Sequence, residues 1–132
     1  MNKKILIIED EPALLAILTD RLTKEEFVPL TAKDGAQGLE IALRDQPDLI
    51  LLDIIMPVMD GMAMLKKLRE SGEWGKTVPV IMLTNLSSDS NKVISEVTAL
   101  QPAYYIVKTD MKLDEVMQKI QEVLTPPAPA TE

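Results

Sequence analysis

Four short, mostly apolar runs recur along the chain, and polar residues follow each of them. The runs are residues 4–8, 49–52, 80–83 and 104–107. Apolar runs of this length are typical of strands buried on both faces of a parallel sheet. Because the carboxyl ends of parallel strands meet at one edge of an open sheet, we expect the residues that follow the runs to converge in space. These residues are Glu9, Asp10, Asp53, Thr84 and Lys108.

Segments with apolar residues at helical spacing separate these runs. They predict helices over 12–24, 35–45, about 61–70 and 88–100, and a last helix after Met111. A further strand is predicted over 27–31, and its Pro29 is tolerated essentially only at a sheet edge. The strand that ends at Asp53 is predicted to begin at residue 48. Gly72 and Gly75 predict a loop before the strand at 80–83. This alternation predicts an α/β fold around a parallel sheet.

The composition limits the chemistry that the chain can perform. A chain of 132 residues suits one domain, which we place at 1–124, with 125–132 as a Pro- and Ala-rich tail or truncated linker. There is no Cys and no His, which excludes thiol nucleophiles, thiolate zinc sites and a histidine base. Catalysis or binding must therefore use carboxylates, Lys or hydroxyls, to which an oxygen-liganded cation can be added.

The net charge and hydropathy of the chain indicate which classes of partner and which cellular location to expect. A net charge of −7 disfavours direct binding to nucleic acid or to anionic membranes. No stretch reaches the roughly 20 apolar residues of a membrane span, and the first apolar run stops at Glu9, too short for a signal sequence. We expect a cytoplasmic location.

The acidic residues at the strand ends predict a metal site. Carboxylates gathered without His favour a hard cation with oxygen ligands, such as Mg²⁺. Two carboxylates 4 Å apart repel by about 1 kcal/mol in water and about 4 kcal/mol at an effective dielectric of 20, which a cation and Lys108 would relieve. An aspartate such as Asp53 can also act as the nucleophile toward a phosphoryl group, with Lys108 and the Thr84 hydroxyl stabilising its oxygens.

Each of these residues also has a simpler interpretation. Glu9 and Asp10 could be solvated residues before a helix, with Glu11 capping that helix. Asp53 and Thr84 could merely end their strands, Lys108 could be a surface lysine, and Tyr105 could be core packing.

Four motifs in this order resemble the receiver domains of two-component response regulators, over about residues 3–124. They are Ile-Ile-Glu9-Asp10-Glu, Leu-Leu-Asp53-Ile-Ile-Met-Pro57-Val-Met-Asp60-Gly61, Met-Leu-Thr84 and Tyr105-Ile-Val-Lys108. The resemblance implies a flavodoxin-like (βα)5 doubly wound parallel sheet with strand order 2-1-3-4-5. This order agrees with Pro29 at an edge.

The resemblance also implies a role for each site residue. Asp53 would be the phosphoacceptor, and Glu9, Asp10, Asp53 and the backbone carbonyl of Ile55 would hold Mg²⁺. Lys108 and Thr84 would contact the phosphoryl group. Tyr105 would follow Thr84 and change the face made by the helix at 88–100, the strand at 104–107 and the last helix. Ile55 and Leu86 occupy positions that tune loss of the phosphoryl group, and because both are apolar we expect a long-lived phosphorylated state.

The function that we expect is a signalling switch rather than a turnover enzyme. The donor would be a histidine kinase or a histidine phosphotransfer protein, since the chain has no His of its own. The downstream effector is not identified, and a homodimer through the switch face is compatible with the resemblance. Two alternatives are a receiver-like scaffold without phosphorylation and a phosphohydrolase of the haloacid dehalogenase type. The second is disfavoured because Ile55 stands where that family places a second acid.

Overall fold

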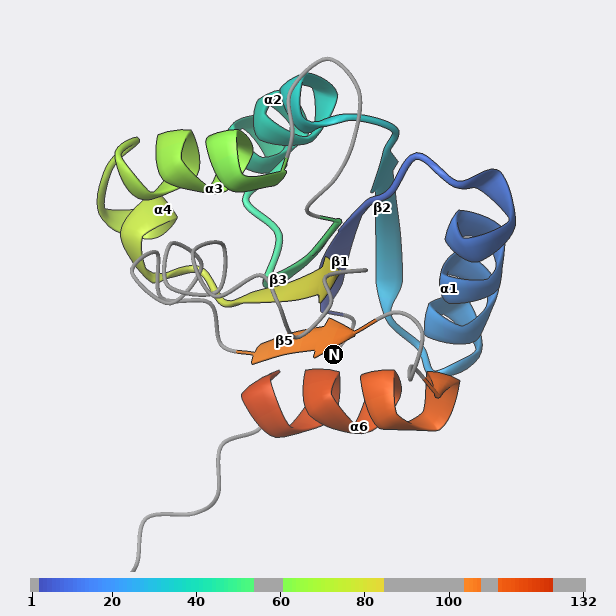
Figure 1. Cartoon of the computed structure of the whole chain (residues 1–132). Coiled ribbons are helices and arrows are strands. Elements are labelled where there is room, and N and C mark those ends of the chain that lie inside the picture. Colours follow the sequence, from blue (N-terminus) through green and yellow to red (C-terminus); the bar gives the residue numbers. More distant parts are fainter. Residues whose placement is uncertain (1–2, 54–60, 85–103, 108–111, 125–132) are drawn as a thin grey trace, which may run out of the picture.

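The chain forms one sheet of five parallel strands in the order β2-β1-β3-β4-β5 (Figure 1). The computed structural model describes residues 3–53, 61–84, 104–107 and 112–124, with only the backbone described for residues 84, 104, 105 and 107. The predicted strand order is confirmed, and Pro29 lies in an edge strand as expected. The strands are β1 (Lys4–Ile8), β2 (Val28–Ala32), β3 (Leu49–Asp53), β4 (Val80–Thr84) and β5 (Tyr104–Val107).

Helices cover both faces of the sheet (Figure 1). One apolar cluster joins the sheet to α2, α3 and α4, and a second joins its other face to α1 and α6. Most of the strand residues of β1, β3 and β4 are fully buried, as expected for strands enclosed between two helical layers. The described helices are α1 (Pro12–Lys24), α2 (Gly35–Asp45), α3 (Gly61–Arg69), α4 (Glu73–Thr77) and α6 (Leu113–Leu124).

Local signals explain where the first two helices begin and end. Pro12 is the first residue of α1, where its missing N–H costs no hydrogen bond. The Asp34 side chain caps α2 by accepting a hydrogen bond from the Gln37 N–H at 2.8 Å. The helix ends at Asp45, and the C-cap residue Gln46 that follows has a left-handed backbone with φ of 44°. Both helices have the predicted bounds.

Four strand boundaries were wrong by one residue, among them the end of the second strand, which lies at Ala32 instead of residue 31. The second strand begins at Val28 instead of residue 27, because the Phe27 N–H donates to Leu22 O and belongs to the turn after α1. The third begins at Leu49, and the Asp48 side chain instead accepts a hydrogen bond from the Lys4 N–H at 2.7 Å. The predicted end of the fourth strand moves from residue 83 to Thr84.

The predicted loop with Gly72 and Gly75 contains the short helix α4. This was not expected, because two glycines in four residues favour a turn over a helix. Two contacts hold the corner between α3 and α4: Arg69 Nη1 donates to Gly75 O at 3.0 Å and to Val78 O at 2.7 Å. Trp74 of α4 packs against the apolar cluster beneath α2 and α3. Tertiary contacts thus outweigh the local preference for a turn.

Gly75→Ala is expected to destabilise the fold by about 2 kcal/mol or more, as a new side chain does when it meets a packed backbone. A Cβ at residue 75 would lie 2.1 Å from Leu68 O, a backbone atom that cannot move without shifting α3. Chemical denaturation would measure the loss. Thr77→Ala, at an exposed position of the same helix, is the control and should change the stability by no more than about 0.5 kcal/mol. If the two variants were equally stable, the backbone between α3 and α4 would accommodate the added methyl group without loss of stability, which would contradict the prediction.

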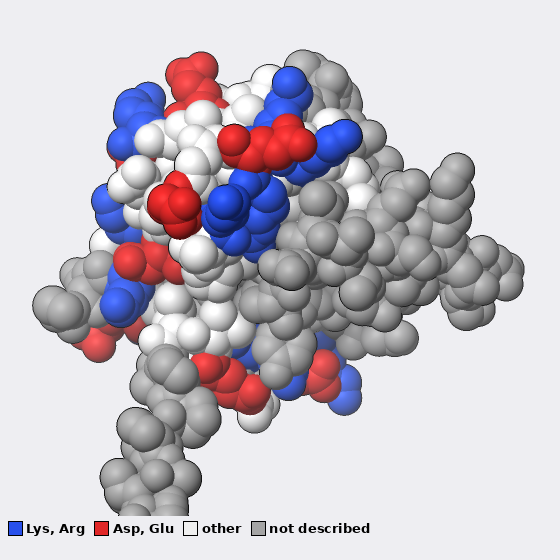
Figure 2. Space-filling model, turned by 90° about the vertical axis from the view of Figure 1, so that its left-hand side faces the viewer, with Lys and Arg blue, Asp and Glu red and all other residues white. Residues whose placement is uncertain are grey.

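The outer surface beside α3 and α4 has charges of both signs. Lys66, Lys67 and Lys76 are exposed there, together with Glu70 and Glu73. Figure 2 shows blue and red side chains lying next to one another over the described part of this face. Among the residues described on it, there is thus no continuous basic area of the kind that neutralises a phosphate backbone.

The predicted helix at 88–100 lies outside the described residues, so its prediction stays a prediction. In the part of the chain that is described, no helix has the length and apolar character needed to cross a bilayer.

Candidate metal centre

Three carboxylates meet at the carboxyl edge of the sheet. One carboxylate oxygen from each of Glu9, Asp10 and Asp53 lies within 4.8 Å of the others. For these three residues, the predicted convergence at the strand ends is confirmed.

The register of the strands produces this meeting. Strands β1 and β3 are neighbours, with Ile8 paired to Leu52, so Glu9 follows one strand beside Asp53 at the end of the other. The Glu9 N–H continues the ladder by donating to Ala32 O at 3.0 Å. The chain then turns into α1 at Pro12, which leaves Asp10 at the sheet edge. All three acids are therefore placed by buried strands rather than by a long loop.

The burial of the cluster contradicts the simpler interpretation of Glu9. Glu9 is 0% exposed and Asp53 is 4% exposed, whereas Asp10 is exposed. Glu9 Oε2 accepts a hydrogen bond from the Glu11 N–H at 3.0 Å, which orients this carboxylate within the turn before α1. Glu11 makes no side-chain cap, so that expectation was wrong as well. Two of the three acids are thus held inside the protein.

The chemistry of this donor set fits a hard divalent cation. At 4.8 Å, each pair of ionised carboxylates repels by roughly 1 kcal/mol in water and about 3.5 kcal/mol at an effective dielectric of 20. A cation removes this repulsion, and three oxygen donors with no nitrogen or sulfur suit Mg²⁺, whose remaining positions are commonly filled by water. The cluster can therefore hold a magnesium ion through Glu9, Asp10 and Asp53.

Asp10 connects the cluster to solvent. It lines an open groove of about 630 Å³ along α1, together with residues of the β2 edge such as Thr31 and Lys33. Asp10 is thus the member of the three-carboxylate cluster that lines this groove.

The backbone of two further predicted residues is described. Asp53 pairs with Leu83 and Thr84 pairs with Val107, so Thr84 ends the strand beside Asp53 at the same edge. Tyr105, in the edge strand β5, pairs with Met82 of β4. Lys108, which directly follows β5, lies outside the described residues, as do Ile55 and Leu86.

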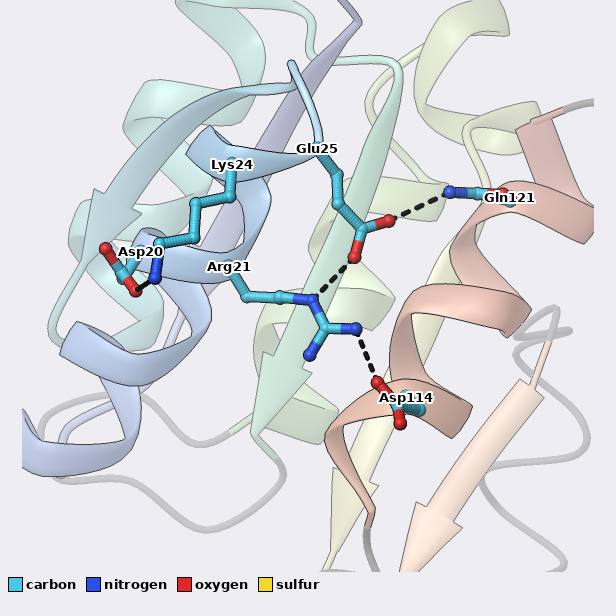
Figure 3. A network of polar contacts seen from close by, with 6 residues as sticks. All are labelled: Asp20, Arg21, Lys24, Glu25, Asp114 and Gln121. Atoms are coloured by element: carbon cyan, nitrogen blue, oxygen red, sulfur yellow. Dashed lines mark hydrogen bonds and ion pairs between the residues drawn. The ribbon is translucent and has the colours of Figure 1, made fainter.

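Contacts between α1 and α6 were not anticipated. Arg21 Nη2 donates to Asp114 Oδ1, although the two residues are 93 positions apart in the sequence (Figure 3). Patterns at helical spacing identify pairs within one helix, and no local pattern marks a pair between two helices.

Comparison with known proteins agrees with the fold. The family model described as "Response regulator receiver domain" matches residues 5–121. A relative described as "Probable transcriptional regulator ycf27", from Porphyridium aerugineum, is 36% identical over 123 residues, which are 93% of this chain and 48% of that protein. Across the first curated relatives, the chain spans between about a fifth and a half of their length.

Two solved structures are similar over nearly their whole length. The chemotaxis response regulator CheY4 of Vibrio cholerae has a TM-score of 0.83 and 28% identity, covering 94% of this chain and 100% of that chain. The receiver domain of the sensor histidine kinase PA1611 from Pseudomonas aeruginosa, with magnesium coordinated in its active-site cleft, has a TM-score of 0.82 and 26% identity, with 94% and 98% coverage. With the family match over most of the chain, these findings show that it belongs to the response regulator receiver domains of two-component systems.

Proposed function

We propose that this receiver domain is a switch that accepts a phosphoryl group on Asp53 in a Mg²⁺-dependent reaction. The observation that carries the proposal is the meeting of Glu9, Asp10 and Asp53 at the carboxyl edge of the sheet. Asp53 is chosen as the acceptor because it ends the central strand β3, between β1 and β4. Its phosphate would lie where metal and phosphoryl ligands from both neighbouring strands can reach it.

In the proposed reaction, one Asp53 carboxylate oxygen attacks the phosphorus of the donor. An O–P bond forms and the bond from phosphorus to the donor breaks, which releases a neutral histidine side chain or, from acetyl phosphate, acetate. Such reactions depend mainly on positioning and on stabilisation of the phosphoryl oxygens. Burial of Asp53 in the strand end restricts its carboxylate to few orientations, which favours attack from a fixed position.

Glu9 and Asp10 would hold Mg²⁺ beside the acceptor, directly or through water, and the Ile55 carbonyl would be a further ligand. When bound, Mg²⁺ neutralises charge on the phosphoryl oxygens. The magnesium in the receiver domain of PA1611 supports this assignment by analogy. The Lys108 ammonium and the Thr84 hydroxyl would stabilise the remaining oxygens.

The output would be a change of surface, with Tyr105 following Thr84. Thr84 is the last residue of β4 and Tyr105 lies in the neighbouring strand β5, which supports a coupling between the two. The surface would involve residues 88–100, β5 and α6, through which an effector or a second copy would bind.

The donor would be a histidine kinase or a histidine phosphotransfer protein. Ile55 and Leu86 are both apolar, which favours slow loss of the phosphoryl group. We further propose that the domain acts as a switch and not as a turnover enzyme.

Intact mass spectrometry after incubation with acetyl phosphate tests the proposal. With Mg²⁺ the mass should rise by one phosphoryl group, and with EDTA in place of Mg²⁺ it should not rise. No gain in either condition, together with no binding of beryllium fluoride, would favour a receiver-like scaffold that works without phosphorylation.

A further inference from the structure

The edge strand β2 directs one row of backbone groups away from the sheet. Among the described strands it pairs with β1 alone, in parallel (Figure 1). Ala32 O accepts a hydrogen bond from the Glu9 N–H at 3.0 Å, so residue 32 directs its backbone groups toward β1. Because these directions alternate along a strand, the outward row consists of Pro29 and Thr31, with Lys33 just beyond the end of β2.

The outward row is accessible from solvent. Thr31 and Lys33 are exposed, and both line the groove of about 630 Å³ that runs along α1. An accessible sheet edge with unpaired N–H and C=O groups is a template for pairing with another strand. A second copy of this chain has the same edge, so two copies can present their β2 strands to one another.

Twofold symmetry defines the hydrogen bonds that such a pairing needs. A twofold axis makes the two β2 strands antiparallel, and paired residues then exchange two N–H···O bonds. With the axis at Thr31, residue 31 of one copy lies opposite residue 31 of the other, and residue 29 lies opposite residue 33. A shift of the axis by one residue in either direction brings residue 29 or 33 opposite Thr31. Every such register therefore needs the N–H of residue 29 or of residue 33.

Neither of these two donors is available. Pro29 has no N–H. The Lys33 N–H already donates to Gln37 Oε1 at 2.8 Å. Gln37 is held in turn by the bond from its own N–H to Asp34 Oδ1, at 2.8 Å, which caps α2. Of the three outward positions, Thr31 is thus the one whose N–H has no acceptor among the described residues.

We propose that Pro29 and the Gln37 side chain close the β2 edge to strand addition and so keep two copies of this chain from joining through it. A strand docked there would gain bonds from the Thr31 N–H alone and would bury carbonyl groups that receive no donor, which is unfavourable. The edge lies at the opposite side of the sheet from β5, so its closure leaves association to other surfaces. The inference does not depend on phosphorylation.

The test restores the missing donors one at a time. Pro29→Val supplies an N–H at residue 29, and Gln37→Ala releases the N–H of Lys33. Either change adds two bonds to the twofold dimer. Each net hydrogen bond contributes roughly a factor of five, so either change should raise the dimer population about thirtyfold. The double variant should raise it about a thousandfold if the two effects add.

A cysteine at residue 31 identifies this dimer specifically. The chain has no Cys, so Thr31→Cys introduces a single thiol into every variant. In the register centred on residue 31, the two Cα atoms would lie about 5.5 Å apart, within the range that a disulfide spans. The initial rate of disulfide formation under mild oxidation, at fixed protein concentration, then reports the dimer population. Sedimentation equilibrium of the variants without the cysteine checks the association independently.

Two matched controls leave the edge unchanged. Pro12→Ala removes a proline at the start of α1, and Gln118→Ala removes an exposed glutamine of α6. Both should cross-link no faster than Thr31→Cys alone. Circular dichroism and thermal unfolding check the fold of each variant. Gln37→Ala leaves β2 itself unchanged, so it tests the inference even where Pro29→Val is less stable.

Three outcomes would overturn the inference. One is cross-linking of the double variant at the rate of Thr31→Cys alone. Another is an increase in the control variants as large as that in Pro29→Val or Gln37→Ala, because the association would then not involve the edge. The third is cross-linking of Thr31→Cys alone as fast as that of the double variant, since the native edge would then be open.

Discussion

Asp53→Asn is expected to abolish Mg²⁺-dependent phosphorylation while the fold is kept. The amide has the volume of the carboxylate but no anionic oxygen to attack phosphorus, so the loss should be complete rather than partial. Intact mass after acetyl phosphate treatment measures it, and circular dichroism with thermal unfolding checks the fold.

Asp48→Asn is the matched control for this change. Asp48 immediately precedes the same strand at its opposite end, where its Oδ2 accepts a hydrogen bond from the Lys4 N–H at 2.7 Å. The amide oxygen of Asn can accept this bond too, so the variant should be labelled as fully as the unsubstituted chain. Label retained in Asp53→Asn would place the acceptor elsewhere.

Mg²⁺ is expected to stabilise the chain strongly through the acidic cluster. A cation that binds only the folded state adds about 2.7 kcal/mol at a concentration of 100 times its Kd. Asp10→Asn removes one anionic ligand but keeps the volume. If this substitution raises the Kd for Mg²⁺ tenfold, the increase in the free energy of unfolding at the same Mg²⁺ concentration falls to about 1.4 kcal/mol. Denaturant unfolding with and without Mg²⁺, at matched ionic strength, measures both values.

Asp20→Asn distinguishes Mg²⁺ binding at the three-carboxylate cluster from binding elsewhere in the groove that Asp10 lines. Asp20 lines the same groove as Asp10 but does not belong to the three-carboxylate cluster. The full Mg²⁺ stabilisation should therefore remain in this variant. Equal stabilisation of Asp10→Asn and the unsubstituted chain would show that the cation binds away from Asp10.

The central strands were predictable because one physical signal dominates them. Runs such as 49–52 and 80–83 are buried on both faces, so their apolar residues are continuous, and parallel pairing then brings the residues after them to one edge. Pro29 identified the edge strand because it lacks the N–H that an interior strand needs. The meeting of Glu9, Asp10 and Asp53 follows from this topology.

The features that the sequence did not predict depend on contacts between distant residues. Helix α4 contains Gly75, which disfavours a helix. It is stabilised by the hydrogen bond from Arg69 of α3 and by the packing of its own Trp74 against the apolar cluster. The bond from Arg21 to Asp114 depends on how two helices cross, which no local spacing shows. The burial of Glu9 was missed for a related reason, because a carboxylate after a strand is equally compatible with solvent until the neighbouring strand end is placed.

The most direct test of the account is to locate the phosphoryl group. The chain is labelled with acetyl phosphate and Mg²⁺ and then treated with borohydride, which reduces an aspartyl phosphate to homoserine, and peptide mass mapping identifies the changed residue. We expect the change at Asp53 alone, absent when Mg²⁺ is omitted. A change at Glu9, Asp10 or any other acid with Asp53 intact would contradict the account.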